Sequence, residues 1–474
     1  VSVCIFGTNL RDSEQLHALG ASLRAVAPNA LIAIDEEGGE VTRLHYLEGS
    51  PYPGAAIMGQ LDDTAYTERI GERVAHDVLS AGFNLVLGPV ADVNSNPRNP
   101  VIGTRSFGAD AALASRHVAA WVRGLEGAGA VSCPKHFPGH GDTAQDSHLA
   151  LPVVDADAAL LAERDLPPFR AAFDAGARTV MTSHILLPEI DPSGPATFSR
   201  AILHDILREQ LGFTGLIVTD ALDMKGASGE VGIPEAAVRA LAAGCELLCL
   251  GTDNTREQLR EIEDHVLAAV REGRLDAEIP RRAAQRVRAL AEQAGQQLAQ
   301  WNRSGRGAPA PPEAAEIARV AESFSGLETA REWLRAHPDA GVIRVDTTAN
   351  IAVSAAPWGP FAAAAHPLPG TQDAARSFSE RPLHPVDDAT PLPWSIERAG
   401  SGVIVIGREL HRRAFAREGI DALRAAGTPV LTVETGWPGH DTVYAELACY
   451  GSSALAGAAL LTLLASVPIE GRHS

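Results

Sequence analysis

The fold of this chain is decided by the stretch Gly129-Ala130-Val131-Ser132-Cys133-Pro134-Lys135-His136-Phe137-Pro138-Gly139-His140-Gly141-Asp142-Thr143, in which a short apolar strand ends in a glycine-rich loop. Glycine permits backbone angles that a side chain forbids, and proline limits how far such a loop can wander. Loops that leave a rigid strand often carry functional side chains. We therefore expect a strand whose carboxyl end presents a reactive loop.

The same strand-and-loop pattern recurs on both sides of this stretch. Short apolar runs alternate with helical segments up to about residue 300, which is typical of βα units around a parallel sheet. Seven runs are predicted strands, at 3–5, 31–34, 85–87, 131–133, 179–182, 216–219 and 246–250. Helices are predicted between them, including 66–81, 113–126, 168–175 and 234–243. This count favours a (β/α)8 barrel of the TIM type, with one unit upstream of Val1 or irregular.

A second domain is expected because 474 residues exceed what one core usually supports. We predict a TIM-barrel catalytic domain at 1–300, closed by a charged helical stretch at 257–293. A Pro/Gly-rich linker at 301–315 and a smaller α/β sandwich domain at 316–468 follow. Strands of that domain are predicted at 341–345, 350–354, 402–407 and 429–433, and 366–394 is expected to be a long surface connection. The final residues, 469–474, resemble a residual protease-cleavage sequence.

Composition excludes several classes of function. A formal net charge of −19 argues against nucleic-acid binding, which needs a concentrated basic face. Five scattered cysteines favour reduced thiols over a disulfide framework. No apolar stretch is long enough to span a bilayer. We expect a cytoplasmic protein without nucleic-acid or membrane partners; export stays an alternative because the sequence starts at Val1 without a methionine.

Asp146 and His148 are the first candidate catalytic pair. Two positions apart in an extended loop, their side chains project to the same side, so that the carboxylate can hold the imidazole tautomer and favour the charged ring. His148 is therefore a candidate general acid and base. In an isolated Asp-Ser-His tripeptide, a helix cap beside a solvated histidine is the more frequent arrangement, but the preceding loop favours the catalytic interpretation.

Asp220 is the candidate nucleophile. It follows the predicted strand 216–219, at the end where barrel enzymes form their sites. A carboxylate there can attack an electrophilic carbon. Its alternative role is the N-cap of the next helix, and spacing alone does not decide between the two.

A third group mixes acceptors with multivalent donors, as recognition of sugar hydroxyls requires: Asp35, Arg43, Arg105, Lys135 and His136. Structural salt bridges explain each of them singly, but their positions after three different strands favour one shared site. A metal site formed by His136, His140, Asp142 and His148 is the weaker alternative, since their spacing is not that of a helical zinc motif. No metal or other cofactor is expected.

These segments resemble glycoside hydrolase family 3, in its β-N-acetylglucosaminidase branch of the NagZ type. The resemblance covers almost all of the first domain, and the Lys-His loop with its downstream Asp-Ser-His is its most specific part. The matching segments are 35–43, 89–94, 99–108, 135–148 and 218–224.

The resemblance implies specific roles. It makes Asp220 the nucleophile, His148 the acid and base, Asp146 the residue that orients His148, and the third group the sugar-binding positions. In the glucosidase branch of the family a glutamate of the C-terminal domain commonly serves as acid and base. Here the loop histidine takes that role, which leaves the contribution of the second domain open.

The implied reaction is a retaining double displacement that removes terminal β-linked N-acetylglucosamine from an oligosaccharide or glycoconjugate. One alternative is phosphorolysis, because a neutral histidine, unlike a carboxylate, does not repel inorganic phosphate. Another is a non-catalytic sugar-binding protein on the same barrel. The natural substrate stays open between a muropeptide of cell wall recycling, a chitin oligosaccharide and a glycoprotein glycan, and the oligomeric state is not predicted.

Overall fold

The computed structural model describes residues 2–229, 231–347, 352–353, 356–394, 400–439 and 441–466. Most of the predicted strand 350–354, and all of the terminal sequence 469–474, lie outside the described residues. The chain divides into two compact units, each of which has its own sheets and core. Unit 1 comprises Val1–Glu37, Asp62–Ile102 and Ser106–Pro309; unit 2 comprises Gly38–Leu61, Gly103–Arg105 and Ala310–Ser474.

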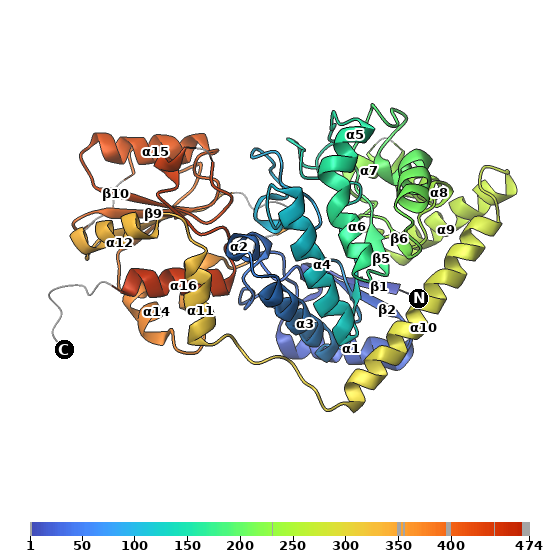
Figure 1. Ribbon diagram of the computed structural model, residues 1–474, viewed down its shortest axis with the longest axis horizontal. Coiled ribbons are helices and arrows are strands. Elements are labelled where there is room, and N and C mark those ends of the chain that lie inside the picture. Colours follow the sequence, from blue (N-terminus) through green and yellow to red (C-terminus); the bar gives the residue numbers. More distant parts are fainter. Residues whose placement is uncertain are drawn as a thin grey trace. The chain divides into compact units, whose positions relative to one another are not determined.

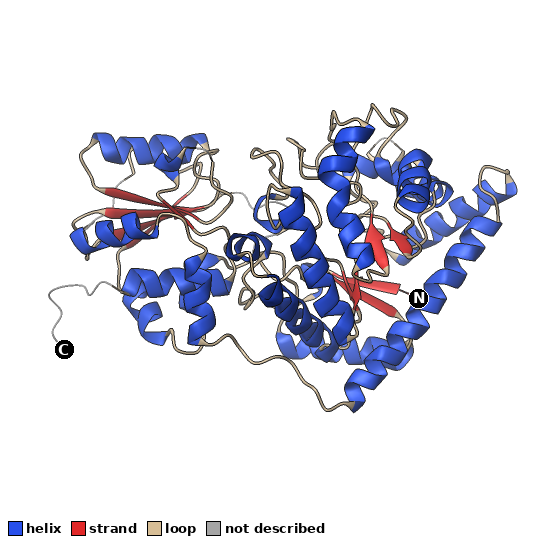
Figure 2. Ribbon diagram, in the orientation of Figure 1, coloured by secondary structure: helices blue, strands red, loops and turns tan. Residues whose placement is uncertain are grey.

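Unit 1 is built on parallel strands (Figure 2). Four of them pair in chain order: β1 (Ser2–Ile5), β2 (Leu31–Ile34), β3 (Leu85–Val86) and β4 (Val131–Ser132). β5 (Thr179–Met181) pairs with β6 (Leu216–Val218). Isolated parallel bridges join Phe137 to Thr182 and Val218 to Leu247. The predicted parallel α/β arrangement is thus confirmed, with shorter strands, and the region 246–250 contributes a bridge rather than a strand.

The strands of both sheets in unit 1 share one apolar cluster. A closed barrel stays a prediction, because the ladders between the described strands form two separate sheets. The shared cluster includes alternate residues of the strands and of the segments that extend them: Leu31, Ala33, Leu85, Leu87, Val131, Cys133, Met181, Leu216 and Val218. Alternate residues of a strand point to the same face, so one face of each of these strands is committed to this core, and Cys4 of β1 packs against it.

The helices of unit 1 begin and end at residues that satisfy their terminal backbone groups. Asp63 caps α3 by accepting a hydrogen bond from the backbone N–H of Tyr66, and Asp110 caps α4 in the same way. Figure 1 shows α3, α4 and α6 side by side. The longer helices are α1 (Ser13–Val26), α3 (Thr64–Ser80), α4 (Ala111–Ala128), α6 (Leu166–Asp174), α8 (Gly232–Ala243), α9 (Arg256–Arg271) and α10 (Glu278–Arg303). The predicted helices are therefore confirmed within a few residues, but the stretch 257–293 divides between α9 and α10.

Further helical segments complete unit 1 and the parts of unit 2 that come before residue 310, and all but the ten-residue η5 are short. They are η1 (Gly7–Asn9), α2 (Ala55–Leu61), η2 (Gly103–Arg105), α5 (Ala158–Leu160), η3 (Leu161–Asp165), η4 (Ala196–Phe198), η5 (Ala201–Gln210) and α7 (Lys225–Ser228). In the part of the chain that the structure describes, no helix combines the length and the apolar character needed to cross a membrane.

Unit 2 contains a five-stranded parallel sheet in the order β11-β10-β9-β7-β8. Consecutive strand residues pack on opposite faces: Val342 and Ile404 join one core, and Ile343 and Val405 join the other. The strands are β7 (Gly341–Val345), β8 (Leu383–Val386), β9 (Val403–Gly407), β10 (Val430–Glu434) and β11 (Leu447–Ala448). The helices are α11 (Ala314–Glu322), α12 (Leu327–Ala336), α13 (Gly359–Ala365), α14 (Gln372–Ser379), α15 (Ala414–Ala425) and α16 (Ala454–Ala465), with a short turn η6 (Thr442–Tyr444). The predicted smaller α/β fold is confirmed.

One prediction about this unit is wrong. The segment 366–394 is not a plain surface connection, because it contains α14 and β8. β8 is an edge strand of the sheet, and Pro385 lies within it. Proline lacks an N–H for the ladder and is therefore confined to edge strands. Because of this proline and the exposed Leu383, the strand lacks the continuous apolar run by which the other strands were predicted.

Candidate functional site

Lys135 lies at the start of the loop that follows β4 and makes two ion pairs. Its Nζ is 2.7 Å from Oδ1 of Asp35 and 2.7 Å from Oε1 of Glu37, both of which follow β2. The lysine is almost fully buried. Carboxylate oxygens accept hydrogen bonds, and hydroxyl groups of a sugar are suitable donors to them.

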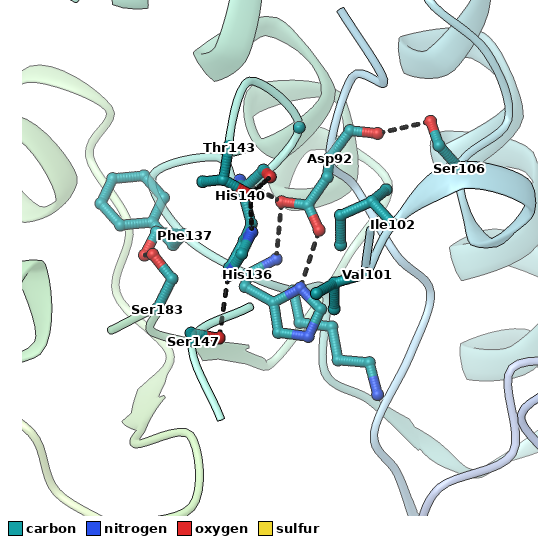
Figure 3. A network of polar contacts seen from close by, with 12 residues as sticks. Asp92, Val101, Ile102, Ser106, His136, Phe137, His140, Thr143, Ser147 and Ser183 are labelled. Carbon is teal, nitrogen blue, oxygen red and sulfur yellow. Dashed lines mark hydrogen bonds and ion pairs between the residues drawn. The ribbon is translucent and has the colours of Figure 1, made fainter. Parts of the chain in front are cut away.

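His136, the next residue, is held by Asp92. The carboxylate accepts hydrogen bonds from the backbone N–H of His136 (3.1 Å) and from its ring Nδ1 (2.7 Å) (Figure 3). It also accepts one from the backbone N–H of His140 (2.7 Å). Burial raises the pKa of the Asp92 carboxyl, but His136 and His140 outweigh burial and hold that pKa below its usual value. Asp92 is therefore a charged anchor beneath the loop, and it engages Nδ1 rather than Nε2 of His136.

Two glycines let the loop pass closely over its neighbours, for different reasons. Gly139 has φ 136°, and a Cβ there would also lie 2.8 Å from the Cβ of Asp165. Gly141 has no such backbone angle, but a Cβ on it would overlap the carbonyl oxygen of Val93. Conformational freedom explains the first glycine and close approach explains the second.

An ion-pair cluster lies under the same loop. Arg164 donates to Asp142 of the loop (2.8 Å) and to the buried Asp165 (2.9 Å). Burial raises the pKa of the Asp165 carboxyl to about 6, although Arg164 acts in the opposite direction. Because Arg164 bridges the two carboxylates, it ties the loop to η3.

Asp146 and His148 form the expected pair. Oδ1 of Asp146 lies 2.6 Å from Nδ1 of His148 and also accepts from the backbone N–H of that residue at 2.9 Å. Burial alone would raise the pKa of the Asp146 carboxyl, but the hydrogen bonds from His148 hold it below its usual value. The carboxylate engages Nδ1, which leaves Nε2 of His148 available to exchange a proton.

Asp220 follows β6, two residues beyond Val218. Its Oδ1 accepts the backbone N–H of Ala221 at 2.8 Å, and Thr219 is fixed by the Leu247 carbonyl. Burial raises the pKa of the Asp220 carboxyl. The neighbouring histidines outweigh burial and hold that pKa below its usual value, so the group is a carboxylate at neutral pH; they are His136, His184 and His148.

The candidate residues are thus divided between the two units. Asp35, Lys135, His136, Asp146, His148 and Asp220 all lie in unit 1, and the electrostatic effects on Asp220 show that the two loop histidines are near it. Arg43 and Arg105 lie in unit 2, with the segments 38–61 and 103–105. There Arg43 donates to the carbonyl of Ala352 at 2.8 Å.

Glu40 joins these segments of unit 2 to its sheet. One carboxylate oxygen accepts from the hydroxyl of Thr104 (3.3 Å) and from the backbone N–H of Ser452 (2.9 Å). The other lies 3.2 Å from Arg408. Both predicted arginines are therefore carried by segments that belong with the C-terminal sheet.

Three residues of the site were missed by the sequence reasoning. Glu37 and Asp92 stand inside quoted motifs, but nothing in a single sequence shows that they contact Lys135 and His136. Nε2 of His184 donates to the carbonyl of Ala221 (3.0 Å) and so helps to fix the backbone next to Asp220. Among the described residues, no group of three or more His, Cys, Asp or Glu side chains is arranged to hold a metal ion.

Known proteins resemble this chain along its first part. The family model of the glycosyl hydrolase family 3 N terminal domain matches residues 1–290. A β-hexosaminidase of Chromobacterium violaceum is 40% identical over 254 residues, which cover 52% of this chain and 70% of that protein. A β-hexosaminidase of Neisseria meningitidis serogroup C is 36% identical over 280 residues, which cover 56% of this chain and 76% of that protein.

Solved structures extend the similarity. A family 3 β-N-acetylglucosaminidase from Paenibacillus sp. aligns with a TM-score of 0.77 and 27% identity, over 99% of this chain and 92% of that one. NagZ from Neisseria gonorrhoeae, solved in complex with N-trifluoroacetyl-D-glucosamine, aligns with a TM-score of 0.51 and 31% identity, over 63% of this chain and 90% of that one. The resemblance predicted from the motifs is confirmed: the chain belongs to glycosyl hydrolase family 3 and is a glycoside hydrolase.

Proposed function

We propose that the protein is a retaining β-N-acetylhexosaminidase that removes terminal β-linked N-acetylglucosamine. Asp220 is the nucleophile, His148 is the general acid and base, and Asp146 orients His148. The observation that carries the proposal is the short contact between Nδ1 of His148 and Asp146, together with the effect of the His148 charge on Asp220. β-Hexosaminidases are among the relatives of this chain, which supports the acetamido sugar as substrate.

In the first step, the Asp220 carboxylate attacks the anomeric carbon and the glycosidic bond breaks. Nε2 of the charged His148 donates its proton to the departing oxygen. In the second step, neutral His148 takes a proton from water, the water oxygen bonds to the anomeric carbon, and the Asp220 carboxylate leaves. Two displacements at one carbon retain its configuration. An imidazole, with a reference pKa of about 6.5, can serve both steps near neutral pH.

The sugar itself is bound, in this proposal, by Asp35, Lys135 and His136 in unit 1. The Lys135 ion pairs and the Asp92 bond fix these side chains before a ligand arrives. Arg43 and Arg105 are assigned to the same role on their match to the family motifs. The division into a catalytic domain at 1–300, a linker at 301–315 and a second domain at 316–468 is part of the same proposal.

The test is a product assay on aryl β-glycosides of N-acetylglucosamine and of glucose, followed by NMR of the newly released sugar. We expect rapid release of N-acetylglucosamine as the β anomer, and slow release of glucose. An α anomer as first product would contradict the double displacement, and equal rates on both sugars would contradict the acetamido preference. The same assay with inorganic phosphate shows whether water or phosphate is the acceptor. Formation of a sugar 1-phosphate would mean that the reaction is phosphorolysis and not hydrolysis.

A further inference from the structure

The segment that carries His148 has few regular hydrogen bonds of its own. Residues 144–150 belong to no helix or strand, and the carbonyl of Asp146 accepts from Leu149 (3.0 Å) and Ala150 (3.1 Å). Ala144, Gln145, Leu149 and Ala150 are exposed, with Leu149 at 61%. Ser147 is the contrast, because it is buried between the two residues of the catalytic pair. Buried polar side chains are normally hydrogen-bonded, so Ser147 is the residue that can anchor this exposed segment.

The Ser147 side chain contacts the Lys-His loop. Its Oγ lies 2.9 Å from Nε2 of His140, and Nδ1 of His140 lies 2.9 Å from Oγ1 of Thr143 (Figure 3). The backbone of His140 is held too, since its N–H donates to Asp92 (2.7 Å) and its carbonyl accepts from Asn99 (2.8 Å). The hydroxyl of Ser147 is therefore bonded to a fixed imidazole.

His140 acts as a neutral partner. Burial, with help from the charge of His136, lowers the pKa of His140 to about 4. At neutral pH one ring nitrogen donates and the other accepts, and the hydroxyls of Ser147 and Thr143 can match either tautomer. The bond to Ser147 therefore does not depend on a charged His140 ring.

The Ser147 backbone contacts the element that follows the nucleophile. Its carbonyl accepts the backbone N–H of Gly226, in α7, at 3.2 Å. A Cβ on Gly226 would lie 3.0 Å from that carbonyl oxygen and 3.0 Å from the Cβ of His184. Glycine at this position lets α7 approach Ser147, and His184 in turn bonds the carbonyl next to Asp220.

We propose that Ser147 is a positioning residue that holds the Asp146–His148 pair in place relative to Asp220, by a side-chain bond to His140 and a backbone bond to Gly226. The inference rests on the proposed function. Loss of either bond leaves the chemical groups intact but misplaces the proton donor. The reaction then loses general-acid assistance rather than nucleophilic attack.

Leaving-group dependence separates these two losses. A phenyl glycoside needs protonation of its departing oxygen, whereas a dinitrophenyl glycoside departs without it. For Ser147→Ala in the full chain, we expect kcat/KM for the phenyl N-acetyl-β-glucosaminide to fall roughly 10- to 100-fold, and that for the dinitrophenyl compound less than about 3-fold, since general acid catalysis is worth roughly 10²–10⁴ in full. Gly226→Ala disturbs the backbone bond, and it should likewise lower kcat/KM more for the phenyl glycoside than for the dinitrophenyl glycoside.

Two comparison variants complete the experiment. Ser22→Ala removes an exposed hydroxyl of α1 that bonds only its own helix at Ala18, and should change neither substrate. His148→Ala should show the leaving-group dependence in full. Equal losses on both substrates, or no loss, for Ser147→Ala beside a leaving-group-dependent His148→Ala would overturn the positioning role alone. If His148→Ala itself lowered kcat/KM equally for the phenyl and the dinitrophenyl glycoside, the proposed function would be contradicted at the acid role of His148. If Ser147→Ala does not fold, Gly226→Ala provides the test, by the same comparison of the kcat/KM losses on the phenyl and dinitrophenyl glycosides.

Discussion

Two Asp–His pairs of unit 1 have nearly the same geometry but different surroundings. Asp92 and His136 meet at 2.7 Å, are 44 residues apart in sequence, and their side chains are 0% and 8% exposed. Asp146 and His148 meet at 2.6 Å, are two residues apart, and their side chains are 12% and 22% exposed. The Asp92 pair joins two chain segments and is fixed by the core, whereas the Asp146 pair lies in one partly exposed segment. Burial therefore separates a pair suited to holding a substrate from a pair suited to exchanging protons.

The largest effect is expected from the exposed pair, on the rate. His148→Ala should lower kcat on the phenyl glycoside by roughly 10²–10⁴-fold, the usual value of a general acid and base. Its unfolding free energy should change by less than about 1 kcal/mol, because the side chain is partly exposed and no core depends on it. Steady-state kinetics and denaturant unfolding of one preparation measure both. A variant that kept its rate, or lost most of its stability, would remove the contrast between the pairs.

Substitution in the buried pair Asp92–His136 should lower the unfolding free energy. Asp92→Asn leaves His136 and two backbone N–H groups facing an amide, and we expect a loss of about 3 kcal/mol in unfolding free energy, the lower range for breaking a buried pair. Asp110→Asn is the matched control: it exchanges two good N-cap residues on α4, and should cost less than about 0.5 kcal/mol. Equal stability of the two variants would show that Asp92 is not an anchor.

The pH dependence of stability sharpens the comparison at His140, which bonds Asp92. Its folded pKa of about 4 is below the unfolded value of about 6.5. The stability that the neutral ring contributes is therefore present above pH 6.5 and is lost as the pH falls toward 4. Between pH 7 and pH 5 the wild type should lose about 2 kcal/mol more than His140→Asn does. Parallel pH profiles for the two proteins would contradict this assignment.

The smallest effect is expected at the partly exposed ion pair under the loop. Asp142→Ala removes one of the two carboxylates bonded by Arg164, while Asp165 remains. Pairs near the surface contribute little, so the loss should be about 0.5 kcal/mol or less, and it should shrink further in high salt. Thermal unfolding at two salt concentrations measures it. A loss comparable with that of Asp92→Asn would mean that the loop is held from this side instead.

The same contrast explains which parts of the molecule could be predicted. The pair Asp146–His148 was visible because its partners are neighbours in sequence, and strands such as Leu31–Ile34 were visible because both faces are buried. The partners Asp92 and His136, or Glu37 and Lys135, come together only when separate strands of one sheet align, and no local pattern encodes that. β8 was missed because an edge strand with Pro385 lacks the apolar signature of the strands beside it.

The central claim is that Asp220 forms a covalent bond to the sugar while His148 acts as the general acid and base. A 5-fluoro N-acetylglucosaminyl compound with a good leaving group slows the second step and accumulates the glycosyl-enzyme, which digestion and mass spectrometry can locate. The account predicts one labelled peptide with the sugar on Asp220, and no label in Asp220→Asn. A label on another carboxylate, or turnover of this compound with no covalent species, would contradict it.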